Sequence, residues 1–365
     1  MSTVSRIFNF SAGPAVLPLA VLEEAREHLL ALPGVGMSIL EISHRSKPFE
    51  EICFGAEAGV RELAGVPDGY HVLFLQGGAT SQFSAVPLNL ATSEGMADYV
   101  ETGVWSQKAI AEATKFCSVN IAASTRATNH DRIPADSEMQ WSAAPAYVHM
   151  TSNNTIYGTQ WHRLPAIPEG VPLVNDASSD IFCRPIDVAA HGLIYAGAQK
   201  NLSIAGLTLV IVRADLVGKA GSATPLYLDY ATHAKERSLF NTPPVFAIYV
   251  LHLVLRKLLA EGGLAAVETR NRRKAGRLYE AIDGSGGFYR GHARVEDRSW
   301  MNVTFRLPSE ELEKRFVAEA TAAGLDGLKG HRSVGGIRAS IYNAFPEEGV
   351  EALTGFMAEF QRTRG

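Results

Sequence analysis

Apolar residues recur with the period of a helix near the start of the chain, and in short continuous runs after that. Residues 19–32 place apolar side chains on one helical face, and Pro33 and Gly34 end the pattern. Residues 71–75 form an apolar run that predicts a buried strand, and a glycine turn with a helix-like segment follows it directly. The chain therefore begins as an alternation of helices and strands.

Further apolar runs of strand length follow, each leading into a polar turn. They span residues 97–102, 146–150, 171–175, 192–196 and 207–212. Most of them lack the apolar–polar alternation of a half-exposed sheet, which favours a largely parallel sheet covered by helices on both faces. Ligands bind such sheets at the carboxyl ends of the strands. We therefore predict an α/β fold whose functional site lies at that edge.

The pattern changes near residue 261, where two glycines follow a long apolar helix. Residues 300–307 then alternate like a half-buried strand, and further helices of amphipathic pattern surround it. We predict a large α/β domain over residues 16–260. A smaller α+β domain is expected from residues 1–15 and 261–365.

Composition excludes several classes of function. The 365 residues carry 34 Lys and Arg against 38 Asp and Glu, so no overall basic field attracts nucleic acid. Three widely spaced cysteines fit neither a disulfide framework nor a Cys-x-x-Cys metal site, and we predict no metal. The chain shows neither an apolar run of membrane-spanning length nor the apolar core of a secretory signal. We expect a cytoplasmic protein that binds neither nucleic acid nor membrane.

Two residues that follow predicted strands are candidates for amine chemistry. Lys200 lies in a loop of small residues, where scarce water favours a neutral amine that forms a Schiff base with an aldehyde or ketone. An exposed surface lysine is the simpler alternative. Asp176 ends the strand at residues 171–175 and suits a protonated pyridine nitrogen, because the carboxylate keeps the ring an electron sink. Capping of the following segment is an equally good interpretation of Asp176.

Three further features indicate a planar, anionic ligand. The glycine turn at residues 76–81 offers backbone N–H groups to a phosphate, although a tight turn capped by Thr80 or Ser81 has the same pattern. Trp105 suits stacking on a planar ring, while a lone Trp is more often a core residue. Two basic clusters suit phosphates and carboxylates, unless they are solvated loop charges. The clusters are residues 43–47 and 329–332, with Arg338 beyond the second. The combination fits pyridoxal phosphate.

Long motifs carry a resemblance to a known family. The motifs span residues 8–15, 41–45, 77–83, 85–89, 184–187, 195–201, 240–244, 329–332 and 335–343. On these motifs the chain resembles the phosphoserine aminotransferase family, whose members are class V, fold-type I pyridoxal-phosphate transaminases. The resemblance runs nearly from end to end.

The resemblance implies a fold, a reaction and an assembly. The fold would be a large domain with a mainly parallel, seven-stranded type of sheet covered by helices, plus a smaller α+β C-terminal domain. The reaction would convert 3-phosphooxypyruvate and L-glutamate to O-phospho-L-serine and 2-oxoglutarate in serine biosynthesis. A second implied role is the formation of 4-phosphohydroxy-L-threonine for pyridoxal phosphate (pyridoxine) biosynthesis. The implied assembly is a homodimer with shared active sites and one pyridoxal 5′-phosphate per subunit.

Position within the motifs assigns a role to individual residues. Lys200 becomes the Schiff-base lysine and proton shuttle, and Asp176 pairs with the pyridine nitrogen. The other expected cofactor ligands are Ala79, Thr80, Trp105, Thr155 and Gln199, with Asn241 and Thr242 from the neighbouring subunit. The expected substrate-binding residues are Ser11, His44, Arg45 and Arg338, with His331 and Arg332 from the neighbouring subunit.

One position departs from part of the family. Thr80 stands where some members carry an Arg, which would add charge near the substrate phosphate, whereas other members carry a small residue there. The departure leaves open how phosphate recognition is divided among His44, Arg45, His331 and Arg332.

Three alternative functions compete with this interpretation. Another class V enzyme, such as an alanine–glyoxylate transaminase or a cysteine desulfurase, would share Lys200 and Asp176 but lack both basic clusters. A cofactor-free Schiff-base aldolase would use Lys200 without Asp176 or the glycine turn. A non-catalytic scaffold would keep the dimer and tolerate loss of Lys200.

Overall fold

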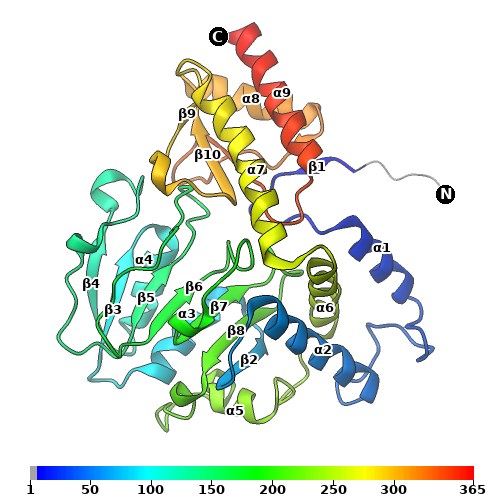
Figure 1. Cartoon of the computed structure of the whole chain (residues 1–365), viewed down its shortest axis with the longest axis vertical. Coiled ribbons are helices and arrows are strands. Elements are labelled where there is room, and N and C mark those ends of the chain that lie inside the picture. The colour runs from blue at the N-terminus through cyan, green and yellow to red at the C-terminus, as the bar shows by residue number, and fades with distance from the viewer. Residues whose placement is uncertain (1–5) are drawn as a thin grey trace.

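The computed structural model describes residues 6–365, and Figure 1 shows the whole chain. The first five residues of the segment 1–15, which we assigned to the small domain, lie outside the described residues. Among residues 6–365, no helix is long and apolar enough to span a membrane. The same residues bring together no group of three or more His, Cys, Asp and Glu side chains placed to hold a metal ion.

A seven-stranded sheet forms the centre of the larger part of the molecule. Its strands in spatial order are β2 (Tyr70–Leu75), β8 (Thr208–Arg213), β7 (Leu193–Gly197), β6 (Leu173–Asp176), β5 (Val148–Thr151), β3 (Met96–Glu101) and β4 (Ser118–Ser124). Strand β8 runs antiparallel to both of its neighbours, and the other pairs are parallel. The predicted α/β fold with a mostly parallel sheet is therefore confirmed.

Helices cover both faces of this sheet. They are α1 (Leu19–His28), α2 (Lys47–Ala64), α3 (Gly78–Leu90), α4 (Val104–Ala113), α5 (Tyr230–Lys235) and α6 (Val245–Ala260). Val72 and Phe74 of β2 pack in the core under α2 and α6, whereas Leu73 and Leu75 pack in the core under α3 and α4. Successive side chains of a strand point to opposite faces, so a strand buried on both faces is apolar throughout.

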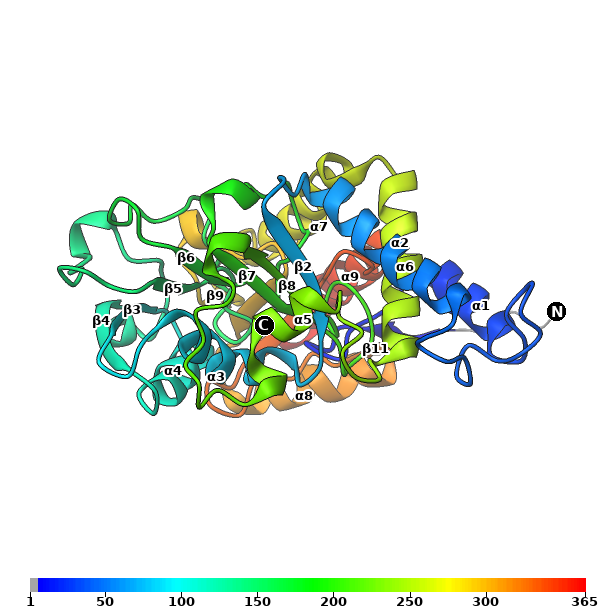
Figure 2. The same ribbon diagram turned by 90° about the horizontal axis from the view of Figure 1, so that it is seen from below.

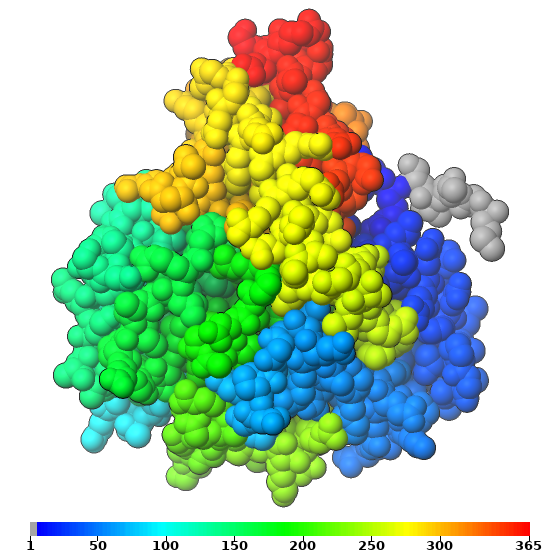
Figure 3. All heavy atoms as spheres, in the orientation of Figure 1, coloured from blue at the N-terminus to red at the C-terminus, as the bar shows by residue number. Residues whose placement is uncertain are grey.

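The second core belongs to a smaller group of elements. Its helices and strands are α7 (Gly263–Asp283), β9 (Arg290–Gly291), β10 (Asn302–Arg306), α8 (Glu310–Ala322), β12 (Ile337–Ser340) and α9 (Glu347–Arg364). Strand β10 pairs antiparallel with both β9 and β12. Figure 1 shows this group above the large sheet, and in Figure 3 the red end of α9 projects from it.

The N-terminal segment belongs to this smaller group. Strand β1 (Phe8–Asn9) pairs in parallel with β11 (Leu325–Asp326), and Phe10 packs against Phe345 with ring centroids 4.4 Å apart. The boundary that we predicted after residue 260 falls between α6 and α7, although the first turns of α7 pack in the core of the large sheet. The division into two domains stays a prediction.

Two elements differ from their sequence-based predictions. The helix expected over residues 19–32 ends at His28, because the backbone turns back and the N–H of Leu32 bonds to the carbonyl of Met37. Strand β4 was not predicted. It lies at an edge of the sheet and is largely solvent-exposed over its first four residues, so it lacks a continuous apolar run.

A buried lysine ties α7 to the segment that follows β12. Lys274 is 1 % exposed, and its Nζ donates to the carbonyl oxygens of Ile341, Tyr342 and Phe345 at 2.9, 2.6 and 3.2 Å. Three acceptors match the three hydrogens of an ammonium group. This contact fixes the path of the chain between β12 and α9.

We expect the substitution Lys274→Met to destabilise the protein by about 1–3 kcal/mol, because three buried carbonyls lose their donor. Urea unfolding followed by circular dichroism measures the effect. The exposed Lys235→Met serves as the matched control, with an expected change within about 0.5 kcal/mol. Equal unfolding midpoints for the two variants would contradict this account of Lys274.

Candidate active site

The carboxyl ends of the parallel strands meet at one edge of the large sheet and open into a cavity of about 330 Å³. Strands β2, β5, β6 and β7 point the same way, so the turns that follow them converge there. The lining residues are Ala12, Gly13, Gly77, Gly78, Ala79, Thr80, Trp105, Thr151, Asn153, Thr155, Ile156, Asp176, Ser178, Ser179, Gln199, Lys200, His331 and Arg338. The cavity thus lies where the sequence analysis placed the site.

The structure brings part of the predicted set together. The predicted residues that line the cavity are Ala79, Thr80, Trp105, Thr155, Asp176, Gln199, Lys200, His331 and Arg338. Those that do not line it are Ser11, His44, Arg45, Asn241, Thr242 and Arg332. Lining residues that sequence reasoning missed include Gly13, Thr151, Asn153, Ser178 and Ser179. The only local signal among them was the pair of serines that follows Asp176, to which the sequence analysis assigned no role.

Lys200 projects its amine into the cavity. Its Nζ donates to Thr155 Oγ1 at 2.8 Å and lies 5.7 Å from the ring centroid of Trp105. Burial lowers the pKa of Lys200 to about 8, and the nearby Arg338 charge acts in the same direction, while the Asp176 charge opposes them. A substantial fraction of this amine is therefore neutral and nucleophilic near physiological pH.

The backbone leaves room for that lysine. Gly13 has φ +148°, and a Cβ there would lie 3.5 Å from Lys200 Cγ and 3.8 Å from Gln199 Cγ. The N–H of Ala15 bonds to the carbonyl of Gln199 at 2.9 Å. The N-terminal segment therefore passes over the base of the Lys200 side chain at van der Waals distance, and the positive φ of residue 13 is what favours a glycine there.

Asp176 is the last residue of β6, and it is almost completely buried. Its Oδ1 accepts a hydrogen bond from the backbone N–H of Ser178 at 3.0 Å. Burial raises the pKa of Asp176, and the hydrogen bonds from Ser178 and the Lys200 charge oppose the rise. A buried carboxylate in the wall of a cavity suits a cationic or proton-donating ligand.

The glycine turn presents free backbone donors to the cavity. Helix α3 begins after Gly77, whose φ is +91°, and no side chain caps its N-terminus. Ser81 Oγ donates to the carbonyls of Gln76 and Gly78 at 3.0 and 2.9 Å. Ser81 therefore closes the turn, as the tight-turn alternative expects, but it does not occupy the N–H groups of the helix. The N–H groups of the first helical turn remain available for an anion.

Positive charge gathers at the side of the cavity formed by the smaller group of elements. Arg338 lies on β12, and its Nη1 donates to the carbonyl of Thr155 at 3.4 Å. Burial lowers the pKa of His331, and the charges of Arg338, Arg332 and Lys108 lower it further. Each of these three cations approaches the imidazole closely enough to disfavour its protonation. The arrangement favours an anion between them.

His331 lines the cavity of the same chain that supplies Lys200. It lies in the loop between β11 and β12. The sequence analysis expected His331 and Arg332 to reach the site from the neighbouring subunit. Arg332 is exposed next to His331.

The remaining predicted residues lie outside this cavity. His44 is half-buried with a buried Nε2 that has no partner among the described residues, and Arg45 is exposed. The carbonyl of Thr242 accepts from Gln76 Nε2 at 2.9 Å, which places the 240–244 segment beside the glycine turn.

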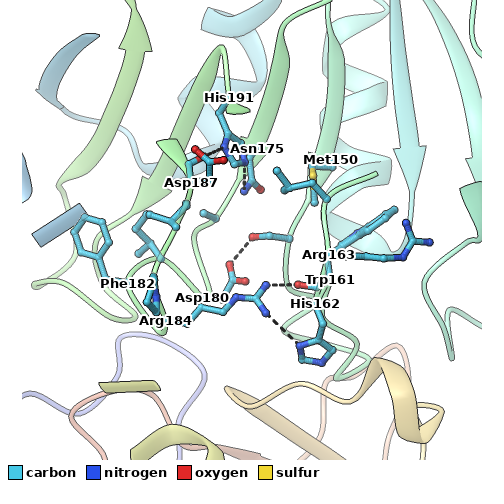
Figure 4. Close-up of a pocket in the computed structure, with 16 residues that line it drawn as sticks. Met150, Trp161, His162, Arg163, Asn175, Asp180, Phe182, Arg184, Asp187 and His191 are labelled. Atoms are coloured by element: carbon cyan, nitrogen blue, oxygen red, sulfur yellow. Dashed lines mark hydrogen bonds between the residues drawn. The ribbon is translucent and has the colours of Figure 1, made fainter. Parts of the chain in front are cut away.

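A second cavity of about 170 Å³ is lined by residues of β5, of β6 and of the loops that follow them, as Figure 4 shows. Asp180 accepts there from Ser152 Oγ, and from Gln160 Nε2 at 3.1 Å. Arg184 donates to the carbonyl of Trp161 and contacts His162 Nδ1 at 3.2 Å. None of the predicted site residues lines this cavity, so it is separate from the Lys200 site.

Residues 7–353 match the family described as aminotransferase class-V. The phosphoserine aminotransferase of Herpetosiphon aurantiacus is 54 % identical over 359 residues, which cover 98 % of this chain and 99 % of that protein. The phosphoserine aminotransferase of Laribacter hongkongensis is 56 % identical over 360 residues, again covering 98 % and 99 %. The chain belongs to the class-V aminotransferases.

Solved structures of phosphoserine aminotransferases superpose closely on this chain. The phosphoserine aminotransferase of Bacillus circulans subsp. alkalophilus superposes with a TM-score of 0.97 at 50 % identity, covering 99 % of both chains. The pyridoxal-phosphate-bound phosphoserine aminotransferase of Trichomonas vaginalis gives a TM-score of 0.92 at 38 % identity, covering 97 % of this chain and 100 % of that one. Within its class, the chain belongs to the phosphoserine aminotransferase family.

We expect Lys200 to react with aldehydes at lower pH than an ordinary lysine. With a pKa of about 8, about half of its amine is neutral at pH 8, against about 0.3 % for a pKa near 10.5. Reductive methylation of cofactor-free protein with formaldehyde and cyanoborohydride, followed by peptide mass spectrometry at pH 7 to 10, measures this. The yield at Lys200 should rise through a midpoint near pH 8. A midpoint near pH 10 would contradict the burial argument.

Proposed function

We propose that the chain is a pyridoxal-phosphate-dependent transaminase that interconverts 3-phosphooxypyruvate and L-glutamate with O-phospho-L-serine and 2-oxoglutarate, the amination step of serine biosynthesis. The observation that carries the proposal is the cavity itself. It holds a reactive amine, Lys200, near the buried carboxylate of Asp176, and Arg338 with His331 forms its cationic side. Membership of the phosphoserine aminotransferase family supports the same reaction.

The cavity has the chemical groups that pyridoxal phosphate needs. Free N–H donors at the start of α3, including those of Ala79 and Thr80, suit its phosphate. The buried indole N–H of Trp105 has no partner among the described residues, and the indole lies beside the Lys200 amine. When bound to Lys200 as a Schiff base, the cofactor supplies an electron sink for negative charge at the substrate carbon.

Individual roles follow from these positions. We propose that Asp176 holds the proton at the pyridine nitrogen and that Trp105 stacks on the ring. Thr155, already a hydrogen-bond partner of Lys200 Nζ, would bond the 3-hydroxyl. Gln199 would contribute to the phosphate site together with Asn241 and Thr242 of the neighbouring subunit.

The chain's own proton carrier is Lys200. Its pKa of about 8 lets the same amine accept and release a proton near neutral pH, which a general acid–base group requires. Thr155 Oγ1, at 2.8 Å, holds the amine on the cavity side. Amino donor and acceptor would use the site in turn, so ping-pong kinetics are expected.

The substrates present two anionic groups to the site, the α-carboxylate and the phosphate. We propose that Arg338 binds the α-carboxylate, which all four substrates share, through its planar guanidinium. The phosphate of the phosphorylated pair would bind His331 and Arg332 of the chain that supplies Lys200, with a contribution from Ser11, because His331 lines that cavity. His44 and Arg45 lie outside the cavity of their own chain, so we assign them to the neighbouring subunit. The sequence analysis gave the two pairs the opposite assignment. Formation of 4-phosphohydroxy-L-threonine for pyridoxal phosphate biosynthesis is a second proposed use of this site. A cytoplasmic location stays a prediction.

An apolar surface supports the proposed homodimer. Residues 19–40 project from the body of the molecule, as Figure 2 shows, and expose several large apolar side chains. They include Leu19, Leu30, Met37 and Leu40, of which Leu30 is 88 % exposed. A second copy of the chain would cover this surface, and His44 and Arg45 follow it directly in sequence.

Two alternative functions fit the structure less well. A cysteine desulfurase needs an accessible reactive thiol, whereas Cys53, Cys117 and Cys183 are all buried and burial raises the pKa of each. A cofactor-free aldolase leaves the glycine turn and the buried Asp176 without a purpose, and membership of class V opposes it.

The purified protein should show a visible absorption band from bound pyridoxal phosphate that is lost on addition of O-phospho-L-serine. We expect unphosphorylated L-serine to bleach the band at least about 100-fold less efficiently, because a phosphate held by charged groups contributes several kcal/mol. Absorbance titration measures both responses. Equal responses to the two amino acids would reject the substrate assignment, and the lack of a band after adding pyridoxal phosphate would reject the cofactor.

Mixing two inactive variants tests the shared site. Lys200→Ala and Arg45→Ala should each be strongly impaired as homodimers. In randomly re-assorted mixtures half of the dimers are mixed, and each mixed dimer holds one intact site, so about a quarter of wild-type activity should return. Refolding the two chains together and assaying transamination measures the recovery. If Arg45 served the site of its own chain, mixing would restore nothing.

A further inference from the structure

A line of buried polar side chains crosses from the Lys200 cavity into the smaller sheet. We call it the amide relay and define it as Ser179, Asn153, Asn302, Ser340 and Tyr342. All five side chains are buried, and Asn302 is 0 % exposed. The relay joins the two sheets, because Asn153 follows β5 of the large sheet and Asn302 opens β10 of the smaller one.

The first half of the amide relay starts in the cavity wall. Asn153 Nδ2 donates to Ser179 Oγ and to Asn302 Oδ1, both at 2.8 Å. Ser299 Oγ donates to Asn153 Oδ1 at 2.5 Å. Both Asn153 and Ser179 line the Lys200 cavity. Asn302 is therefore one side-chain contact away from the site.

The second half of the relay reaches the strand that carries Arg338. Asn302 Nδ2 donates to Ser340 Oγ at 2.9 Å and to the Tyr342 hydroxyl at 3.2 Å. The Tyr342 hydroxyl donates in turn to the carbonyl of Ala12, which also lines the cavity. Every polar atom of the Asn153 and Asn302 side chains has a partner, so the relay admits one arrangement of its members.

Arg338 lies on β12 together with Ser340, and both side chains point to the same face of the smaller sheet. Ser340 pairs with Asn302 across β12 and β10, and Arg338 lies two residues earlier, so their side chains point to the same face. The next pair on that face is Thr304 with Arg338, and Thr304 Oγ1 donates to the carbonyl of Tyr157 at 2.8 Å. Strand β10 therefore holds β12 against the loop that follows β5.

That loop also positions the amine. Thr155 accepts from Lys200 Nζ through its hydroxyl at 2.8 Å and from Arg338 Nη1 through its carbonyl at 3.4 Å. Asn153 precedes it by two residues and is bonded to Asn302. The distance between Lys200 and Arg338 thus depends on how this loop sits on β10.

We propose that Asn302 is a positioning residue that sets where the Arg338 guanidinium lies relative to the Lys200 amine. The inference rests on the proposed function, in which Arg338 binds the α-carboxylate of every substrate. Loss of the relay would let β12 shift against the loop at residues 151–159. The shift would weaken binding of phosphorylated and unphosphorylated substrates alike, whereas loss of a phosphate ligand would weaken only the former.

The test compares Asn302→Ala, Tyr342→Phe and a matched control in the holoenzyme. We expect Asn302→Ala to raise KM for both L-glutamate and O-phospho-L-serine by about tenfold or more and by similar factors, with kcat changed less than about threefold. Tyr342→Phe removes one hydroxyl of the relay and should show the same pattern more weakly. The visible band and cofactor content should stay as in the wild type.

Asn89→Ala is the control, because Asn89 is equally buried and makes three hydrogen bonds within the large domain, to the carbonyls of Ala85 and Leu228 and from the N–H of Tyr230. It should lower the melting temperature without raising either KM. A KM for L-glutamate that rises equally in the Asn89 and Asn302 variants would overturn the proposal, since general destabilisation would then explain the effect.

A double-mutant cycle with Arg338→Ala decides whether Asn302 acts through Arg338. In the Arg338→Ala background, Asn302→Ala should change kcat/KM for L-glutamate less than about twofold, because the group that it positions is gone. If the two substitutions instead lower kcat/KM independently, so that the loss in the double variant is the product of the two single losses, the inference would be overturned. If the wild-type protein transaminates L-glutamate but not O-phospho-L-serine, the proposed substrate is rejected. The role of Asn302 is then decided by the KM for L-glutamate alone.

Discussion

The structure depends on one constraint, which is that an amine and a carboxylate are held out of water at the ends of adjacent parallel strands. Asp176 pairs with Tyr195 in the register of β6 and β7, and Lys200 follows a few residues later. Neighbouring strands are about 4.8 Å apart, so this pairing brings both turns to one point. Burial disfavours the charged form of either group. The surrounding turns leave a cavity beside both groups, in which a ligand of opposite charge or with matching hydrogen bonds offsets the cost of burying them.

Both sheets contribute residues to the Lys200 cavity. The large sheet alone provides the amine, the carboxylate and the free N–H groups of α3, whereas Arg338 and His331 arrive from the second core. The distance between Lys200 and Arg338 therefore depends on how the two parts of the molecule pack against each other. The hydrogen bond between Asn153 and Asn302 crosses between the two parts and adds a directional constraint that apolar packing alone does not supply.

Much of this arrangement was predictable from the sequence, and the reasons for failure are physical. Six of the seven strands of the large sheet were predicted from apolar runs, because both faces of these strands are buried. The edge strand β4 is partly exposed and was not predicted. Lys200, Asp176 and Trp105 were found because each is unusual for its place after a strand. Asn153 was missed, since its partner Asn302 is distant in sequence and only the folded chain brings the two together.

The pairing of β1 with β11 has a consequence for the order of events during synthesis. The segment around Gly13 forms one wall of the cavity, yet the strand that anchors it is translated only near the end of the chain. Contacts of such large sequence separation form late in folding. The ribosome must therefore synthesise most of the polypeptide before this wall of the cavity is anchored, so a chain that ends before residue 325 lacks that anchor.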